Sequence, residues 1–195
     1  MHRTASLMFL TIAGLGAGAS GGVSMVGDSV EFWGRPQLTG VWDQRQGPTV
    51  VTDPGVEYTS AIGPTTLFDI DIAETSIELR SGTDWYSPWF NSGFAPSAFE
   101  IRDIDVVGQP SLVITGISVQ FSGTIAPHAS APGGFPAFSA SNFEFDDHSV
   151  RIVYGGYEFS PDSVVHIDLT FGAVPSVGTP AVAMLGLMGA NRRRR

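Results

Sequence analysis

The chain has 195 residues with no cysteine and no lysine, and all ten of its basic residues are arginines. Between residues 20 and 173, five arginines face all 19 acidic residues, which gives this part of the chain a net charge of −14. Such a surface disfavours binding to nucleic acid and to anionic lipid. Without cysteine, the fold must be stabilised by core packing and not by disulfide bonds.

The front of the chain has the layout of a secretory signal peptide. His2 and Arg3 form a short basic start, residues 5–18 are small and apolar, and Ala17-Gly18-Ala19 fits the small-residue pattern of a cleavage site. We therefore predict a signal peptide at 1–19, cut after Ala19 or alternatively after Gly21, and passage through the Sec translocase.

Residues 20–173 are enough for one domain, and their hydrophobic pattern has a period of two almost throughout. No segment there shows a convincing helical period of about 3.6 residues. The pattern predicts an all-β domain, an antiparallel β-sandwich of jelly-roll-like type. A segment rich in proline, alanine, glycine and serine at 126–141 is expected to be a surface loop. The expected strands are 29–33, 49–51, 66–72, 76–80, 99–106, 112–121, 143–145, 150–154 and 164–171.

The densest aromatic cluster contains Trp85, Tyr86 and Trp89. Aromatic rings at the end of a rigid sandwich can stack on the faces of sugars, which makes these three residues candidates for a sugar-binding platform. Aromatic residues also dominate ordinary cores, so the same cluster could instead close one end of the sandwich.

Two pairs of aspartates are spaced two residues apart, Asp69 with Asp71 and Asp103 with Asp105. Residues two apart on a strand share one face, so each pair could present two carboxylates to one hard cation such as calcium. No loop has a calcium-binding spacing of the Asp-x-Asp-x-Asp-Gly kind. The pairs are therefore weak candidates for a metal site, and the other interpretation is that they form the solvated face of a sheet. We predict no cofactor, with bound calcium as the alternative.

One segment offers a candidate nucleophile. The sequence Gly27-Asp28-Ser29-Val30 resembles the nucleophile block of GDSL-type hydrolases. The accompanying Asp-x-x-His pair is missing, since Asp162 and His166 are four residues apart, and the oxyanion blocks of that α/β family are not apparent. A polar turn between strands explains these residues better, so we predict no enzymatic activity.

The last 22 residues combine a proline-containing stretch, an apolar run at 180–190 and four terminal arginines. The run of 11 residues is short for a helix that crosses a bilayer, which needs about 20. Extended back through Val174, it approaches a full span, and the basic end would then stay cytoplasmic. We expect a short hydrophobic helix here, with residues 20–173 outside the cytoplasm.

This tail resembles the PEP-CTERM sorting signal of exported bacterial proteins, which ends in a Val-Pro-Glu-Pro motif, an apolar helix and an arginine cluster. The matching positions include Val174 and Pro175, whereas Ser176 replaces the glutamate of the motif and Val177 replaces its second proline. The other matching positions are the apolar run and Arg192, Arg193, Arg194 and Arg195. The resemblance implies processing by an exosortase-type enzyme and transient insertion in the inner membrane of a Gram-negative-type bacterium.

These observations predict three parts: a signal peptide at 1–19, a β-sandwich domain at 20–173 and a sorting tail at 174–195. The expected function is that of an exported, non-enzymatic structural or adhesive protein of the cell envelope or extracellular matrix. The alternative is a carbohydrate-binding module, with or without calcium, whose partner would be an exopolysaccharide. An esterase is the third and most distant interpretation.

Overall fold

The computed structural model describes residues 22–36, 39–61, 68–87 and 95–173. The predicted signal peptide and the predicted apolar helix of the tail lie outside these residues. Over the described part, the chain forms antiparallel strands and one 3₁₀ turn at Ala140–Asn142, and no helix there is long and apolar enough to cross a membrane. The prediction of an all-β, antiparallel fold is confirmed.

The first five-stranded sheet has the order β10-β11-β7-β1-β2. Its central strands follow the predicted alternation, since Val30 and Phe32 of β1 are fully buried and the residues between them are not. The strands are β1 (Ser29–Arg35), β2 (Gln44–Val50), β7 (Ala98–Arg102), β10 (Phe143–Phe145) and β11 (Val150–Val153).

The second five-stranded sheet has the order β3-β4-β5-β13-β8. Ile70, Leu79 and Ile167 are buried in β4, β5 and β13, and their neighbours along each strand face the other way. The strands are β3 (Tyr58–Ala61), β4 (Phe68–Ile72), β5 (Ser76–Ser81), β8 (Leu112–Ser122) and β13 (Val164–Ala173).

The two sheets pack face to face, because their buried residues belong to one hydrophobic core. Phe99 of β7 shows this directly: its ring lies 5.3 Å from that of Phe32 in its own sheet and 6.1 Å from that of Phe68 in the other, between ring centroids. The core therefore lies between the layers, and each sheet keeps one outer face for polar side chains.

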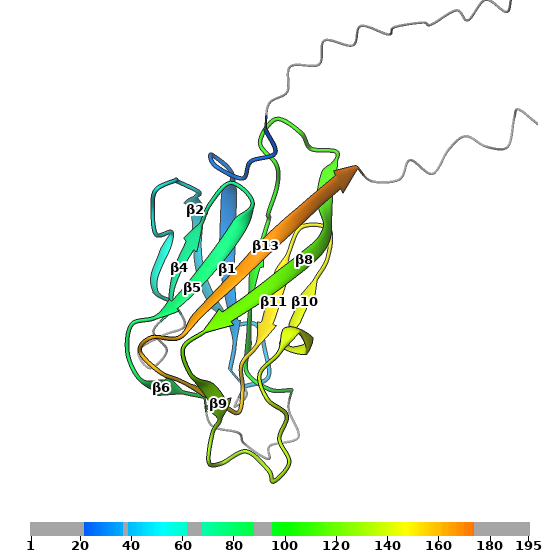
Figure 1. The fold of residues 1–195 in the computed structure, drawn as a ribbon. Helices are drawn as coiled ribbons and strands as arrows, with labels where there is room; N and C mark the ends of the chain where they lie inside the picture. The colour runs from blue at the N-terminus through cyan, green and yellow to red at the C-terminus, as the bar shows by residue number, and fades with distance from the viewer. Residues whose placement is uncertain (1–21, 37–38, 62–67, 88–94, 174–195) are drawn as a thin grey trace, which may run out of the picture.

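A small three-stranded sheet lies at one end of the molecule (Figure 1). It contains β6 (Trp85–Tyr86), β12 (Tyr157–Phe159) and β9 (Ile125–Pro127). Phe159 anchors it to the core, with its ring perpendicular to that of Phe68 at 5.1 Å. The described chain begins at Gly22 and ends at Ala173 at the opposite end (Figure 1).

The structure differs from the expected strands in three respects. The strand expected at 49–51 is the end of a longer strand, β2, which begins at Gln44 and ends at Val50. The strand expected at 99–106 ends at Arg102, because Asp103 has a positive φ of 59° and turns the chain out of the sheet, although Ile104 and Val106 are still buried. The strands β3, β6, β9 and β12 were not predicted. They have two to four residues each, too few to show a period.

Candidate functional site

Of the three residues predicted as a sugar platform, Tyr86 is the one whose side chain the structure describes. Its ring is 58% exposed and lies parallel to the ring of His128, with centroids 4.4 Å apart and an angle of 8° between the planes. The backbone of Trp85 pairs with Phe159, but its side chain and the whole of Trp89 lie outside the described residues. Tyr86 is thus an exposed ring, as a platform requires.

Hydrogen bonds of His128 fix the position of the stacked pair. The backbone N–H of His128 donates to the carbonyl oxygen of Gly156 at 2.8 Å, and Nδ1 of its ring accepts from the backbone N–H of Ser130 at 3.1 Å. Because Nδ1 accepts this bond, the proton of the neutral imidazole lies on Nε2. The His128 ring covers one face of Tyr86, so the other face and the edge of the phenol provide its exposed area.

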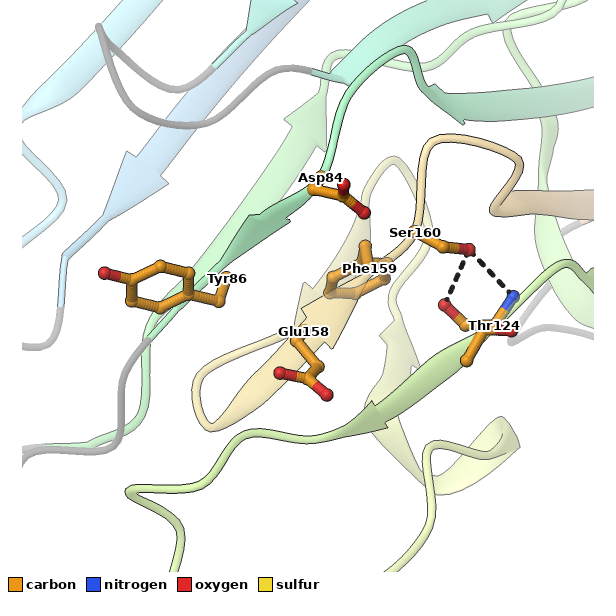
Figure 2. Close-up of a pocket in the computed structure, with 6 residues that line it drawn as sticks. All are labelled: Asp84, Tyr86, Thr124, Glu158, Phe159 and Ser160. Carbon is orange, nitrogen blue, oxygen red and sulfur yellow. Dashed lines mark hydrogen bonds between the residues drawn. The ribbon is translucent and has the colours of Figure 1, made fainter.

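Tyr86 also lines a cavity of about 390 Å³ on the small sheet (Figure 2). Tyr86 and Glu158 are direct partners in the β6–β12 pairing, while Asp84 precedes β6. Across the cavity, Ser160 Oγ contacts Thr124, accepting from its N–H at 3.0 Å and donating to its carbonyl oxygen at 3.2 Å. In Figure 2 the Tyr86 ring points away from Asp84 and Ser160.

Asp84 and Glu158 give this cavity two carboxylates that can accept hydrogen bonds, and Tyr86 lines it with its exposed ring pointing away from Asp84 (Figure 2). Within the described part of the chain, neither Asp84 nor Glu158 forms an ion pair. Carboxylate oxygens accept hydrogen bonds from hydroxyl groups, and a ring face gives an apolar surface of the kind a pyranose covers. The arrangement therefore suits a hydroxyl-rich ligand better than an anion.

The first acidic pair lies on the outer face of β4, as expected. Asp69 stands opposite Arg80 and Asp71 opposite Glu78 in the pairing with β5. Partial burial raises the pKa of the Asp71 carboxyl, and the charges of Glu57 and Glu78 raise it further. The described residues contain no group of three or more histidines, aspartates or glutamates placed to hold a metal ion.

The second acidic pair does not share a strand face, because the chain turns at Asp103. Asp105 instead lies beside Asp28: its backbone N–H donates to Asp28 Oδ2 at 2.7 Å, and its side chain contacts His148 Nδ1 at 2.9 Å. Burial raises the pKa of Asp28, and the charges of Asp105 and Asp103 add to the shift. These acids are brought together by the end of β7 and not by the spacing that made them candidates.

The candidate nucleophile and its candidate base lie on opposite layers. Ser29 is exposed on the outer face of the first sheet, next to buried Val30. His166 lies on the outer face of the second sheet, where its Nε2 is 3.1 Å from Asp168 Oδ1 and its Nδ1 is 3.5 Å from Glu78 Oε2. The core separates the two faces, so the structure does not bring Ser29 and His166 together.

The outer face of the first sheet carries a cluster that the sequence did not reveal, here called the arginine–tryptophan face. Its members are Trp33, Trp42, Arg35, Arg45, Arg102 and Arg151. The guanidinium groups of Arg35, Arg102 and Arg151 lie 4.9–5.4 Å from the centre of the Trp42 ring, and those of Arg45 and Arg102 lie 5.3 and 4.8 Å from that of Trp33. Contacts of this kind contribute about 0.5–1 kcal/mol each at exposed sites.

Carboxylates already pair with most of these arginines. Glu100 is 4% exposed; its Oε2 accepts from Arg102 Nε at 2.6 Å and its Oε1 from Arg151 Nη2 at 3.1 Å. Arg45 pairs with Glu31, and this bond lowers the pKa of Glu31. Arg35 donates instead to the carbonyl oxygen of Pro96 at 3.2 Å. Three of the four arginines therefore pair with a carboxylate, and the contacts of this face join β1, β2, β7 and β11.

The sequence contains part of the signal for this face. Glu31, Trp33 and Arg35 alternate with buried residues in β1, and in β7 the charged residues Glu100 and Arg102 alternate with the apolar residues Phe99 and Ile101. Alternation shows that such residues point outward. It does not show that Trp33 lies opposite both Arg45 and Glu100, which depends on the order of strands in the sheet.

No protein-family model, no curated protein and no solved structure matches this chain. The residues of the predicted sorting tail, from Val174 to the four terminal arginines, lie outside the described residues.

Proposed function

We propose that this is an exported, non-enzymatic structural or adhesive protein, sorted by its C-terminal tail to the cell envelope or extracellular matrix. The predicted signal peptide would direct it through the Sec translocase, and an exosortase-type enzyme would process the tail. The observation that carries the proposal is the order of a folded core within residues 22–173 followed by an apolar run and four arginines.

The arrangement of the described residues supports this proposal. The core is closed by strands that end at Ala173, directly before the tail begins. Gly22 and Ala173 lie at one end of the molecule, and the small sheet with Tyr86 lies at the other (Figure 1). A protein tethered through residue 174 would present the Tyr86 end away from the membrane.

We also propose that the domain is a jelly-roll-like β-sandwich. The chain crosses repeatedly from one five-stranded sheet to the other, from β2 to β3, from β7 to β8, and from β11 through β12 to β13. Such crossings between layers are typical of Greek-key and jelly-roll sandwiches.

Removal of the tail is expected to abolish surface retention without changing the fold. In a bacterium that encodes an exosortase, the full chain should be found at the cell surface, and a chain ending at residue 173 should be released. A fragment of residues 20–173 should show the same circular dichroism and melting temperature as the domain in the full chain, because the core lies within it.

The sorting part of this test has a charge variant and a matched control. Replacing the four arginines 192–195 by glutamine should stop normal sorting, because a basic flank sets the orientation of an apolar segment. Asn191→Gln, which changes the adjacent position without changing charge, should sort normally. Unfolding or aggregation of the 20–173 fragment alone would show that the tail belongs to the core and would contradict the proposal.

The second candidate function is carbohydrate binding, favoured by the exposed Tyr86 ring beside the cavity that Asp84 and Glu158 line. We expect Tyr86→Ala to weaken retention of the 20–173 fragment on a polysaccharide by roughly tenfold, the upper range for loss of one ring contact. The melting temperature should hardly change, because the ring is exposed. Affinity electrophoresis against neutral and acidic polysaccharides measures the first effect and thermal unfolding the second.

Phe145→Ala is the matched control, because Phe145 is also an exposed aromatic residue on a strand, 43% exposed, in the first five-stranded sheet. It should leave polysaccharide retention unchanged. Equal losses for both variants, or no retention of the unmodified protein on any polysaccharide, would eliminate the carbohydrate-binding alternative.

A further inference from the structure

The second five-stranded sheet ends in an unusually long edge strand. β8 has 11 residues, from Leu112 to Ser122, and pairs on one side with β13. At its start the other side is occupied, because the N–H groups of Leu112 and Ile114 donate to the carbonyl oxygens of Gln109 and Asp147. After the bulge at Thr115, no strand of the described part of the chain pairs with the outer edge of residues 116–122.

Beyond the bulge at Thr115, this edge has none of the charged side chains, prolines or very short strand lengths by which sheets usually prevent edge-to-edge pairing. The strand β8 contains no charged residue and no proline. The other edges have such features: Arg45 and Pro48 lie in β2, β3 has four residues, and β10 has three residues including Glu144. The contrast identifies 116–122 as the one long unprotected edge among the described strands.

The side chains of this edge alternate in a way that suits pairing with an identical strand. Ile117, Val119 and Phe121 stand opposite the buried residues of β13 and are themselves only partly buried or exposed. Ser118 and Gln120 lie on the outer face, opposite Asp168 and His166. In an antiparallel pair of two copies, apolar residues would meet apolar residues on one face, and uncharged polar residues would meet on the other.

Charge also favours this edge for contact between copies. Two domains that each carry −14 repel one another wherever acidic side chains approach closely. On the outer face, the charged side chain nearest to this edge is that of Asp168, which lies one strand away in β13. In a pair of copies joined at β8, the two Asp168 side chains would lie three strand spacings apart, roughly 14 Å. This distance exceeds the screening length of about 8 Å at physiological salt.

We propose that the outer edge of residues 116–122 pairs with the same edge of a second copy of this chain, antiparallel and about a twofold axis. The two second sheets would then form one continuous sheet across the dimer, an isologous contact in which each copy supplies the same surface. This inference adds a partner to the structural role proposed above, and it does not depend on the sorting tail.

Cysteine cross-linking in cells that express the full chain tests the proposal, because the chain has no cysteine of its own. Ser118→Cys should give a dimer with a short bis-maleimide. The matched control is Thr59→Cys, exposed on β3 at the opposite edge of the same sheet, which should stay monomeric. Because the read-out is a dimer band, it does not change if the chain is sorted elsewhere than proposed.

A second experiment introduces a charge at this edge. Adding Gln120→Lys to Ser118→Cys should reduce the dimer roughly fivefold or more, because like charges then face each other across adjacent strands. Co-expression with a chain that carries Gln120→Glu and Ser118→Cys should restore it as a mixed dimer. The proposal is overturned by a Ser118→Cys chain that stays monomeric, by equal cross-linking at Thr59, or by a dimer that Gln120→Lys leaves unchanged.

Discussion

Phe99→Ala is expected to lower the free energy of unfolding by about 3–5 kcal/mol, the usual cost of deleting a large buried aromatic ring. Phe99 is fully buried in β7, and its ring contacts those of Phe32, Phe68 and Tyr154. Phe68 belongs to the opposite sheet and itself packs against Phe159 of the small sheet. Removing Phe99 therefore opens a cavity at the place where all three sheets meet.

Equilibrium urea unfolding of the 20–173 fragment, followed by circular dichroism, measures this effect. Phe145→Ala removes the same side chain from an exposed position and should cost less than about 1 kcal/mol. A total stability of about 5–15 kcal/mol is typical of a domain, so the Phe99 variant should lose a large fraction of it. Similar losses for the two variants would contradict the described core.

Stability is expected to fall steeply above pH 10 because burial raises the pKa of two tyrosines, Tyr58 and Tyr154. Burial raises the pKa of Tyr154, and burial likewise raises that of Tyr58, whose hydroxyl donates to the carbonyl oxygen of Val30 at 2.8 Å. In the unfolded chain a tyrosine has a pKa of about 10. Above that pH the unfolded state releases protons that the folded state still holds, so unfolding becomes more favourable.

The expected slope is a loss of about 1.4 kcal/mol per pH unit for each of the two tyrosines, until their pKa values in the folded state are reached. Urea unfolding at a series of pH values between 9 and about 11.5 measures it. In the Tyr58→Phe, Tyr154→Phe double variant most of this slope should disappear. An identical pH dependence in the two proteins would show that these hydroxyl groups ionise as readily in the folded state as in the unfolded one.

Alternation predicted most of the strands, including the short β10 and β11, but it missed the first half of β2 and all of β3, β6, β9 and β12. In β4, β5 and β13 every second residue is apolar and buried, and the sequence placed these strands to within about two residues. The end of β7 could not be predicted, because Ile104 and Val106 continue the period after Asp103 has turned the chain. The alternation of apolar residues indicates which side chains are buried. At Ile104 and Val106 the side chains are still buried, although the backbone no longer pairs with a neighbouring strand.

The candidate site was only partly predictable for a related reason. An exposed aromatic ring at Tyr86 was among the expected features, but its stacking on His128 and its pairing with Glu158 depend on β9 and β12, which are too short to predict. The arginine–tryptophan face was missed because its contacts cross strands that are far apart in the chain. Sequence spacing describes neighbours along a strand, whereas both surfaces are built from neighbours across strands.

The placement of the arginines has a consequence for resistance to proteolysis. Trypsin-like proteases cleave after lysine or arginine, and between residues 22 and 173 the chain offers five arginines and no lysine. Loops are where folded proteins are usually cut, yet Arg45, Arg80 and Arg151 lie inside strands. Arg35 and Arg102 are the last residues of β1 and β7. Cleavage after Arg45, Arg80 or Arg151 requires the strand to leave its sheet, so the rate of cleavage at these three positions follows the stability of the sheets and not the exposure of the loops.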